Sequence, residues 1–159
     1  MLKWVWIVLG LGLVLGPVLW MMPSAAQSRQ AKLRTRASQL GLQVKVAEMP
    51  QVHRARVRKE DTLSGAMYML RHPPRHQCQS WLVCRERGAE WDVETLATVP
   101  QQQRNVLQGL LPQLAVDIYA FEQNPQGIAV YWREQGDESA VDRCLAYLQQ
   151  LAQAQLLLP

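Results

Sequence analysis

The sequence predicts an α+β domain that follows an N-terminal transmembrane helix. Three features lead to this prediction: an apolar stretch at residues 2–22, alternating segments typical of strands, and a helical apolar stripe near the C-terminus. We expect a small antiparallel sheet with the C-terminal amphipathic helix packed on it. The chain is therefore divided into a transmembrane helix at 1–22, a basic juxtamembrane helix at 23–40 and a small α+β domain at 41–159.

The apolar stretch at 2–22 carries Lys3 as its only charge. As a helix at about 1.5 Å per residue it is roughly 30 Å long, which matches the hydrocarbon core of a bilayer. Gly12 and Gly16 have the spacing that lets two membrane helices approach closely, although glycine is also simply common in membrane helices. Indole side chains prefer the headgroup boundary and flank the stretch at Trp4, Trp6 and Trp20.

A cleaved signal peptide is the alternative interpretation of this segment. Ser24, Ala25 and Ala26 would supply the small residues of a cleavage site before Gln27. The apolar stretch is longer than the usual apolar core of a signal peptide, which favours the anchor. A cationic flank is also hard to translocate, and here it consists of Arg29, Lys32, Arg34 and Arg36.

The charge distribution predicts the orientation of an uncleaved anchor. The flank after the span is more basic than the N-terminus, and the more basic flank of a span stays in the cytoplasm. In a bacterial inner membrane, the N-terminus should therefore face outward and the domain should lie on the cytoplasmic side. Residues 1–76 carry twelve Lys and Arg against three acids, whereas residues 77–159 carry five against ten. Because anionic lipids attract basic residues near the membrane, we expect the flanking cluster to face lipid.

A second basic cluster lies at His53–Lys59 and includes Arg54, Arg56, Arg58 and Lys59. In an extended strand the three arginines would share one side. Such a row is typical of a solvated edge strand or loop, which we favour, and the alternative is a contact with lipid or an acidic protein. Since no nucleic-acid motif accompanies the charge, we expect membrane lipids and another membrane protein, or a second copy, as partners, and no nucleic acid.

The elements of the first half follow from local signals. Pro23 should end the membrane helix, and Ser24 with Gln27 should cap a second helix that Gly41 terminates. Alternation predicts a strand at 42–46. Further strands are expected at 65–70 and 80–85, with a proline-containing loop at 72–76 between them.

The second half contains the clearest pattern. A short helix after Pro100 should bury Val106, Leu107, Leu110 and Leu111, although residues 86–105 are otherwise hard to assign. Segments 114–121 and 128–133, joined by an Asn-Pro-Gln-Gly turn, predict a hairpin. The C-terminal helix carries an apolar stripe of Val141, Cys144, Leu145, Leu148, Leu151 and Ala152.

Few residues suggest chemistry. His72, His76, Cys78 and Cys84 lack the spacing of a known zinc motif, so no metal site and no cofactor are expected. Cys78 and Cys84 could pair in an oxidising compartment and should stay reduced in the cytoplasm. The sequence contains no nucleophile elbow and no phosphate-binding loop, so we expect the protein to be non-enzymatic. Carboxylates near turns are usually solvated, and we expect this of the acids around the hairpin, Asp117, Glu122, Glu134 and Asp137.

The segment Met21–Leu40, MMPSAAQSRQAKLRTRASQL, resembles small single-pass bacterial inner-membrane proteins. In outline it is similar to the small accessory subunit of the preprotein translocase, in which a span precedes a basic linker. The Gly-Asp and Gly-Gly strand pattern of that family is missing at residues 40–46, so the resemblance implies no functional residue. It implies an accessory or interaction module at the membrane. The alternative is a signal-cleaved periplasmic domain that binds a ligand or a metal.

Overall fold

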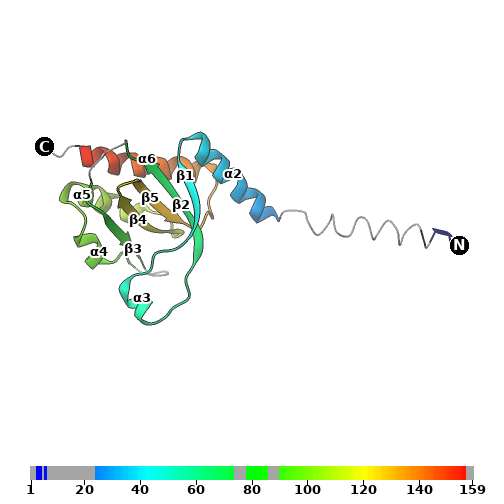
Figure 1. Ribbon diagram of the computed structural model, residues 1–159, viewed down its shortest axis with the longest axis horizontal. Coiled ribbons are helices and arrows are strands. Elements are labelled where there is room, and N and C mark those ends of the chain that lie inside the picture. The colour runs from blue at the N-terminus through cyan, green and yellow to red at the C-terminus, as the bar shows by residue number, and fades with distance from the viewer. Residues whose placement is uncertain (1–2, 5, 7–23, 74–77, 86–89, 157–159) are drawn as a thin grey trace. The chain divides into compact units, whose positions relative to one another are not determined.

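The protein is described here by a computed structural model (Figure 1). The described residues are Lys3, Trp4, Trp6, 24–73, 78–85 and 90–156. The chain divides into two compact units, residues 1–31 and residues 32–159.

The predicted transmembrane span lies mostly outside the described residues, and this includes Gly12, Gly16 and Trp20. Trp4 and Trp6 are helical and exposed. Within the described part of the chain, no helix combines the length and the hydropathy that crossing a membrane requires.

Helix α2 (Ala25–Gln39) is the predicted basic helix. Ser24 and Gln27 cap its start reciprocally: the Ser24 N–H donates to Gln27 Oε1 at 2.9 Å and the Gln27 N–H donates to Ser24 Oγ at 3.2 Å. At its end Gly41 has φ +79°, and the Leu42 N–H donates to the Ala37 carbonyl at 3.0 Å. This C-terminal motif needs the left-handed conformation that glycine adopts without strain. Both predicted ends of the helix are confirmed.

The described residues form a five-stranded antiparallel sheet in the order β1-β2-β5-β4-β3. The hairpin turn follows Asn124, whose Oδ1 accepts the N–H groups of Gln126 and Gly127 at 2.9 and 3.2 Å. The α+β class, the antiparallel sheet and the hairpin are thus confirmed. The strands are β1 (Gln43–Glu48), β2 (Ser64–Arg71), β3 (Trp81–Cys84), β4 (Ile118–Asn124) and β5 (Gly127–Trp132).

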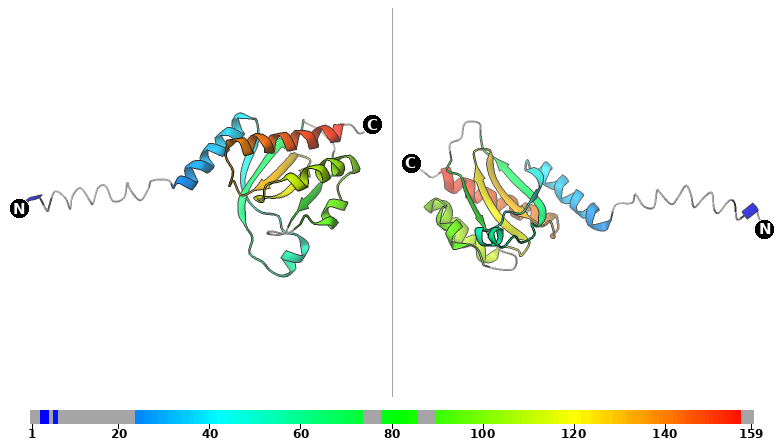
Figure 2. Two further views of the ribbon diagram at one scale, coloured as in Figure 1. Left: turned by 180° about the vertical axis from the view of Figure 1, so that it is seen from behind. Right: turned by 60° about the horizontal axis from the view of Figure 1, so that its bottom comes forward.

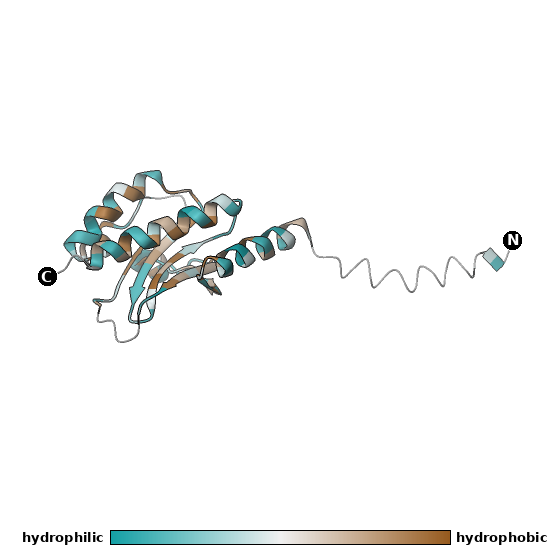
Figure 3. Ribbon diagram, turned by 90° about the horizontal axis from the view of Figure 1, so that it is seen from above, coloured by the Kyte–Doolittle hydropathy of each residue, from teal (hydrophilic) through white to brown (hydrophobic). Residues whose placement is uncertain are grey.

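One face of the sheet is covered by helices. Helix α6 (Glu138–Leu156) lies across β2 and β5, and α5 (Gln101–Leu110) packs beside α6 on the same side (Figure 2). Hydrophobic and hydrophilic residues alternate around α6, as expected of a helix with one side in the core (Figure 3). The predicted stripe is confirmed: Val141, Cys144, Leu148 and Leu151 are buried against the sheet, with Leu33 and Ala37 of α2 in the same cluster.

The other face is covered at one end by α3 (His53–Val57) and the chain around it. In Figure 1, α6 lies above the sheet and α3 below it. The strand-like row of arginines expected here is wrong. The segment is helical because Val52 and Ala55, three residues apart, point to one side and bury against the sheet. Helix α4 (Val93–Ala97) lies in the stretch that sequence patterns left unassigned.

Candidate functional site

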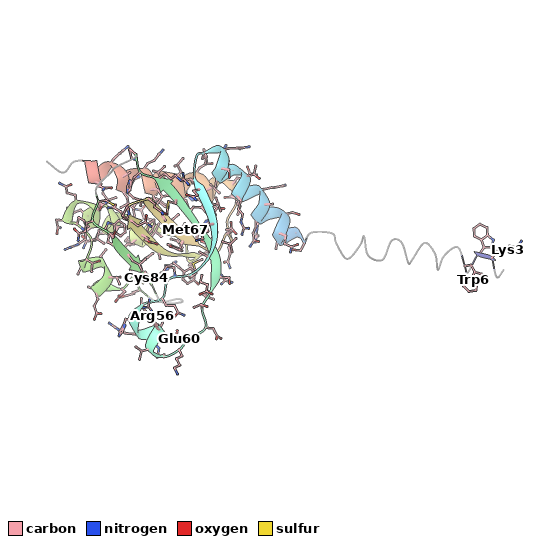
Figure 4. The ribbon with its side chains drawn as sticks, viewed as in Figure 1. Lys3, Trp6, Arg56, Glu60, Met67 and Cys84 are labelled. Atoms are coloured by element: carbon pink, nitrogen blue, oxygen red, sulfur yellow. The ribbon has the colours of Figure 1, made fainter. Side chains whose placement is uncertain are left out.

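A cavity of about 460 Å³ lies beside α3, over the sheet face opposite α6. Figure 4 shows Arg56 and Glu60 in this region, below Cys84. The apolar part of the wall consists of Met49, Pro50, Val52, Ala55 and Leu63. The polar part consists of Gln51, Arg58, Lys59, Glu60, Asp61, Arg85 and Tyr119.

The turn after α3 is held in a defined shape. Lys59 has φ +54°, and the Glu60 N–H donates to the Ala55 carbonyl at 3.2 Å. Gln51 Nε2 donates to the Glu60 carbonyl at 3.0 Å, which joins the start of α3 to its end. The Met49 N–H donates to the Leu63 carbonyl at 2.7 Å and closes the segment. The segment from Met49 to Leu63 is therefore a loop closed by hydrogen bonds, and it forms one wall of the cavity.

Arg85 follows β3 and forms the opposite wall. Its Nη2 donates to the Ala115 carbonyl at 2.7 Å, and its guanidinium lies 5.1 Å from the centroid of the Trp91 ring and 5.9 Å from that of Tyr119. Burial lowers the pKa of Arg85, while the nearby Tyr119 and Asp117 oppose that shift. Among the described residues no carboxylate lies within ion-pair distance of Arg85.

Part of the second basic cluster belongs to the cavity wall. Arg58 and Lys59 line the cavity, and Arg58 pairs with Glu60 at 2.7 Å. Arg54 lies 3.7 Å from Glu94 of α4, with both side chains largely exposed. Arg56 is exposed. The sequence signal that marked the cluster was its charge, whereas Arg85 and Tyr119 carry no local signal and were missed.

The first basic cluster is divided between solvent and the domain. Arg34 binds the Glu134 carboxylate through two hydrogen bonds, Nε to Oε1 at 2.8 Å and Nη2 to Oε2 at 2.6 Å. Arg36 pairs with Asp142 at 2.9 Å. Arg29 and Lys32 are exposed and have no ion-pair partner among the described residues. A lipid contact by this cluster would therefore depend mainly on Arg29 and Lys32.

Glu134 is buried, and the expectation of a solvated carboxylate there is wrong. Its side chain is 1% exposed, and it also accepts a hydrogen bond from the Tyr68 hydroxyl at 2.9 Å. Burial and the Glu134 charge both raise the pKa of Tyr68, so this hydroxyl stays a donor. The Glu134 hydrogen bond raises the pKa of Arg34. No local pattern could indicate the pairing, because Arg34 lies 100 residues from Glu134.

The other acids have local roles. Asp117 Oδ2 accepts the Gln135 N–H at 3.1 Å, and Glu122 binds the Tyr131 hydroxyl. Asp137 precedes α6, where its Oδ1 accepts the Ala140 N–H at 3.1 Å. These contacts link β4 to β5, join the segments that flank the two strands, and hold the start of α6.

Cys78 and Cys84, two of the residues considered for a metal site, lie apart along the sheet. Cys78 Sγ contacts the Asn124 carbonyl at 3.3 Å, whereas Cys84 pairs with Ala120. Four residues along a strand span roughly 13 Å, well beyond the reach of a disulfide. Cys78, Cys84 and Cys144 are all free. His76 lies outside the described residues, and the described part of the chain holds no group of three or more metal-binding side chains.

The cysteines give a first testable prediction. Burial raises the pKa of Cys84 to about 11 and that of Cys144 to about 12, so both stay protonated near neutral pH. At about pH 8.5, the usual thiol pKa, iodoacetamide should modify half-exposed Cys78 first and reach the other two only after unfolding in urea. Mass spectrometry of peptides after timed labelling checks this.

The same shifts predict a loss of stability in alkali. A thiol whose pKa is raised by folding stabilises the folded state below its unfolded value of about 8.5, and that contribution disappears as the pH rises through the folded value. The free energy of unfolding should therefore fall between about pH 8.5 and about pH 12, with the Cys84 contribution lost by about pH 11. The decline should be shallower in Cys84→Ala. For the labelling experiment, equal rates for all three thiols in the folded protein would contradict the burial of Cys84 and Cys144.

Comparison with protein-family models, with curated proteins and with solved structures finds no match to this chain. Functional conclusions therefore depend on the residues and the geometry described above.

Proposed function

We propose that this protein is a non-enzymatic single-pass membrane protein whose domain binds a partner molecule at the cavity beside α3. The observation that carries the binding role is the contrast between the two faces of the sheet. One face is closed by α5 and α6, whereas the other holds a cavity of about 460 Å³ with charged and apolar walls. This volume falls in the range of small-molecule binding sites, about 300–1,000 Å³.

The membrane role is supported by the sequence ahead of the domain. The apolar stretch 2–22 is followed, after Pro23 and Ser24, by the capped, basic helix α2. Arg29 and Lys32 are available to anionic lipid, at about 1 kcal/mol for each basic residue close to the surface. The resemblance to the translocase accessory subunit favours another membrane protein, or a second copy, as the neighbour of the span.

A topology experiment tests the anchored arrangement. In a bacterial host, a cytoplasmic fluorescent reporter fused after Pro159 should be active, and alkaline phosphatase at the same site should be inactive. The full chain should also remain in the membrane fraction after alkaline carbonate extraction. Intact mass should show the uncleaved N-terminus.

Two outcomes would overturn this proposal. Activity of only the phosphatase fusion would place the domain outside the cytoplasm, and a mature N-terminus at Gln27 would show signal cleavage. Either result would favour the exported domain with a ligand-binding role. Replacing Arg29 and Lys32 with glutamate should increase the fraction of molecules with the opposite orientation, since positive charge next to the span sets the orientation.

A further inference from the structure

We propose that the cavity beside α3 binds a carboxylate attached to a small apolar group; the assignment rests on the binding role proposed above for this cavity. Three properties of the wall carry it: the balance of charge, the open hydrogen-bond donors, and an apolar floor.

The charge of the wall favours an anion. Arg58 is neutralised by Glu60 at 2.7 Å, so this pair contributes little net field. Among the described residues, Lys59 and Arg85 have no carboxylate within ion-pair distance. Asp61 also lines the cavity, which leaves one net positive charge. A single carboxylate would therefore bring the wall to neutrality.

Arg85 and Tyr119 offer donors to that carboxylate. In the described residues, Nη2 is the nitrogen of the Arg85 guanidinium that has a hydrogen-bond acceptor, the Ala115 carbonyl. Because a guanidinium has five N–H groups, the others remain for a ligand. The Tyr119 hydroxyl has no hydrogen-bond partner in the described part of the chain, although the residue is 94% buried (6% exposed). Because the Trp91 and Tyr119 rings hold the guanidinium, little side-chain entropy is lost on binding.

The remaining wall suits a small apolar group. Met49, Val52 and Ala55 are buried at 3–5% exposure, and Leu63 packs against the same cluster. Methionine and branched side chains adapt to aliphatic groups and gain favourable burial. A branched aliphatic group next to the carboxylate would contact this floor while the charge faces Arg85. A free acid and the C-terminal residue of a polypeptide both carry this chemistry.

Isothermal titration of the full chain in detergent micelles tests the assignment. N-acetyl-leucine should bind at least about tenfold more tightly than N-acetyl-leucinamide, which has the same body without the charge. To separate the two sources, 4-methylpentanoate represents a free acid and an alanine-rich tetrapeptide ending in leucine represents a polypeptide C-terminus. The tighter of these two identifies the source.

Variants link the binding to the proposed wall. Tyr119→Phe keeps the ring and should weaken N-acetyl-leucine about fivefold, and Arg85→Gln should weaken it by at least about tenfold. Tyr147→Phe and Arg143→Gln make matched changes on α6 and should leave the affinity unchanged. Urea midpoints of all four variants identify any variant that fails to fold. Tyr119→Phe remains decisive in that case, because it removes only a hydroxyl group.

Equal affinity for N-acetyl-leucine and N-acetyl-leucinamide, or an unchanged affinity in Tyr119→Phe, would overturn the carboxylate assignment. Absence of binding by every probe would do the same. Such a result would leave the topology of the protein untouched, so a wrong ligand class and a wrong membrane arrangement are distinguishable.

Discussion

Replacing Arg34 with alanine is expected to lower the free energy of unfolding by about 2–3 kcal/mol. Among the described residues, the change leaves the Tyr68 hydroxyl as the remaining side-chain donor to the Glu134 carboxylate, which is 1% exposed. A buried charge that loses its counterion costs about 3–5 kcal/mol, and the 36% exposure of Arg34 lets water recover part of it. Urea unfolding of the full chain, followed by tryptophan fluorescence, measures the change.

The reverse deletion should cost less. In Glu134→Gln the guanidinium of Arg34 is left without its anion, but this side chain reaches water and stays hydrated. The double variant should therefore be more stable than Arg34→Ala alone, since it contains no buried unpaired charge. Arg36→Ala is the matched control: its pair with Asp142 is exposed on both sides, and the loss should stay below about 1 kcal/mol. Equal costs for Arg34→Ala and Arg36→Ala would contradict this account.

The Arg34 contact bears on the proposed function. From Lys32 onward, α2 belongs to the same compact unit as the sheet. Arg34 bonds this part of α2 to Glu134, which lies two residues after the end of β5. Loss of this pair should loosen the helix at its C-terminal half. If the anchored arrangement is right, the same variant should become more sensitive to protease between the span and the domain.

Local patterns predicted the parts of the fold that are local. The hairpin follows from an Asn-Pro-Gln-Gly turn between two apolar segments, and α6 follows from its stripe of buried residues. The segment around α3 was predicted as extended because Arg54, Arg56 and Arg58 alternate. The same sequence places Val52 and Ala55 at helical spacing, and burial against the sheet decides between the two. Tertiary packing therefore overrode the more visible pattern.

The candidate site was harder to predict than the fold. Charge alone drew attention to Arg58 and Lys59, which do line the cavity. Arg85 directly follows β3 and Tyr119 lies on β4, and these strands pair only in the folded sheet, where the Arg85 N–H donates to the Tyr119 carbonyl at 3.0 Å. Such a pairing depends on register, which single-sequence patterns do not specify.

Replacing Gln103 with alanine is expected to lower the free energy of unfolding by about 3 kcal/mol. Gln103 is 1% exposed and links α5 to three other elements, β3, β4 and α6. Its Oε1 accepts the Trp81 indole N–H at 3.0 Å, and its Nε2 donates to Gln123 Oε1 at 2.6 Å and to the Leu151 carbonyl at 3.2 Å. Truncation leaves these buried groups without their partner and opens a cavity between α5 and the sheet.

The cost should depend on the polar network rather than on side-chain size. Gln103→Leu fills most of the volume but cannot pair with Trp81 or Gln123, so it should remain destabilising by about 2 kcal/mol. Gln101→Ala is the matched control, since Gln101 is exposed on the same helix and its side chain bonds Arg104 and Asn105 of α5. This change should cost less than about 0.5 kcal/mol. Urea midpoints at constant m-value give the comparison. A Gln103→Leu protein as stable as the parent would show that packing, and not hydrogen bonding, holds α5 on the sheet.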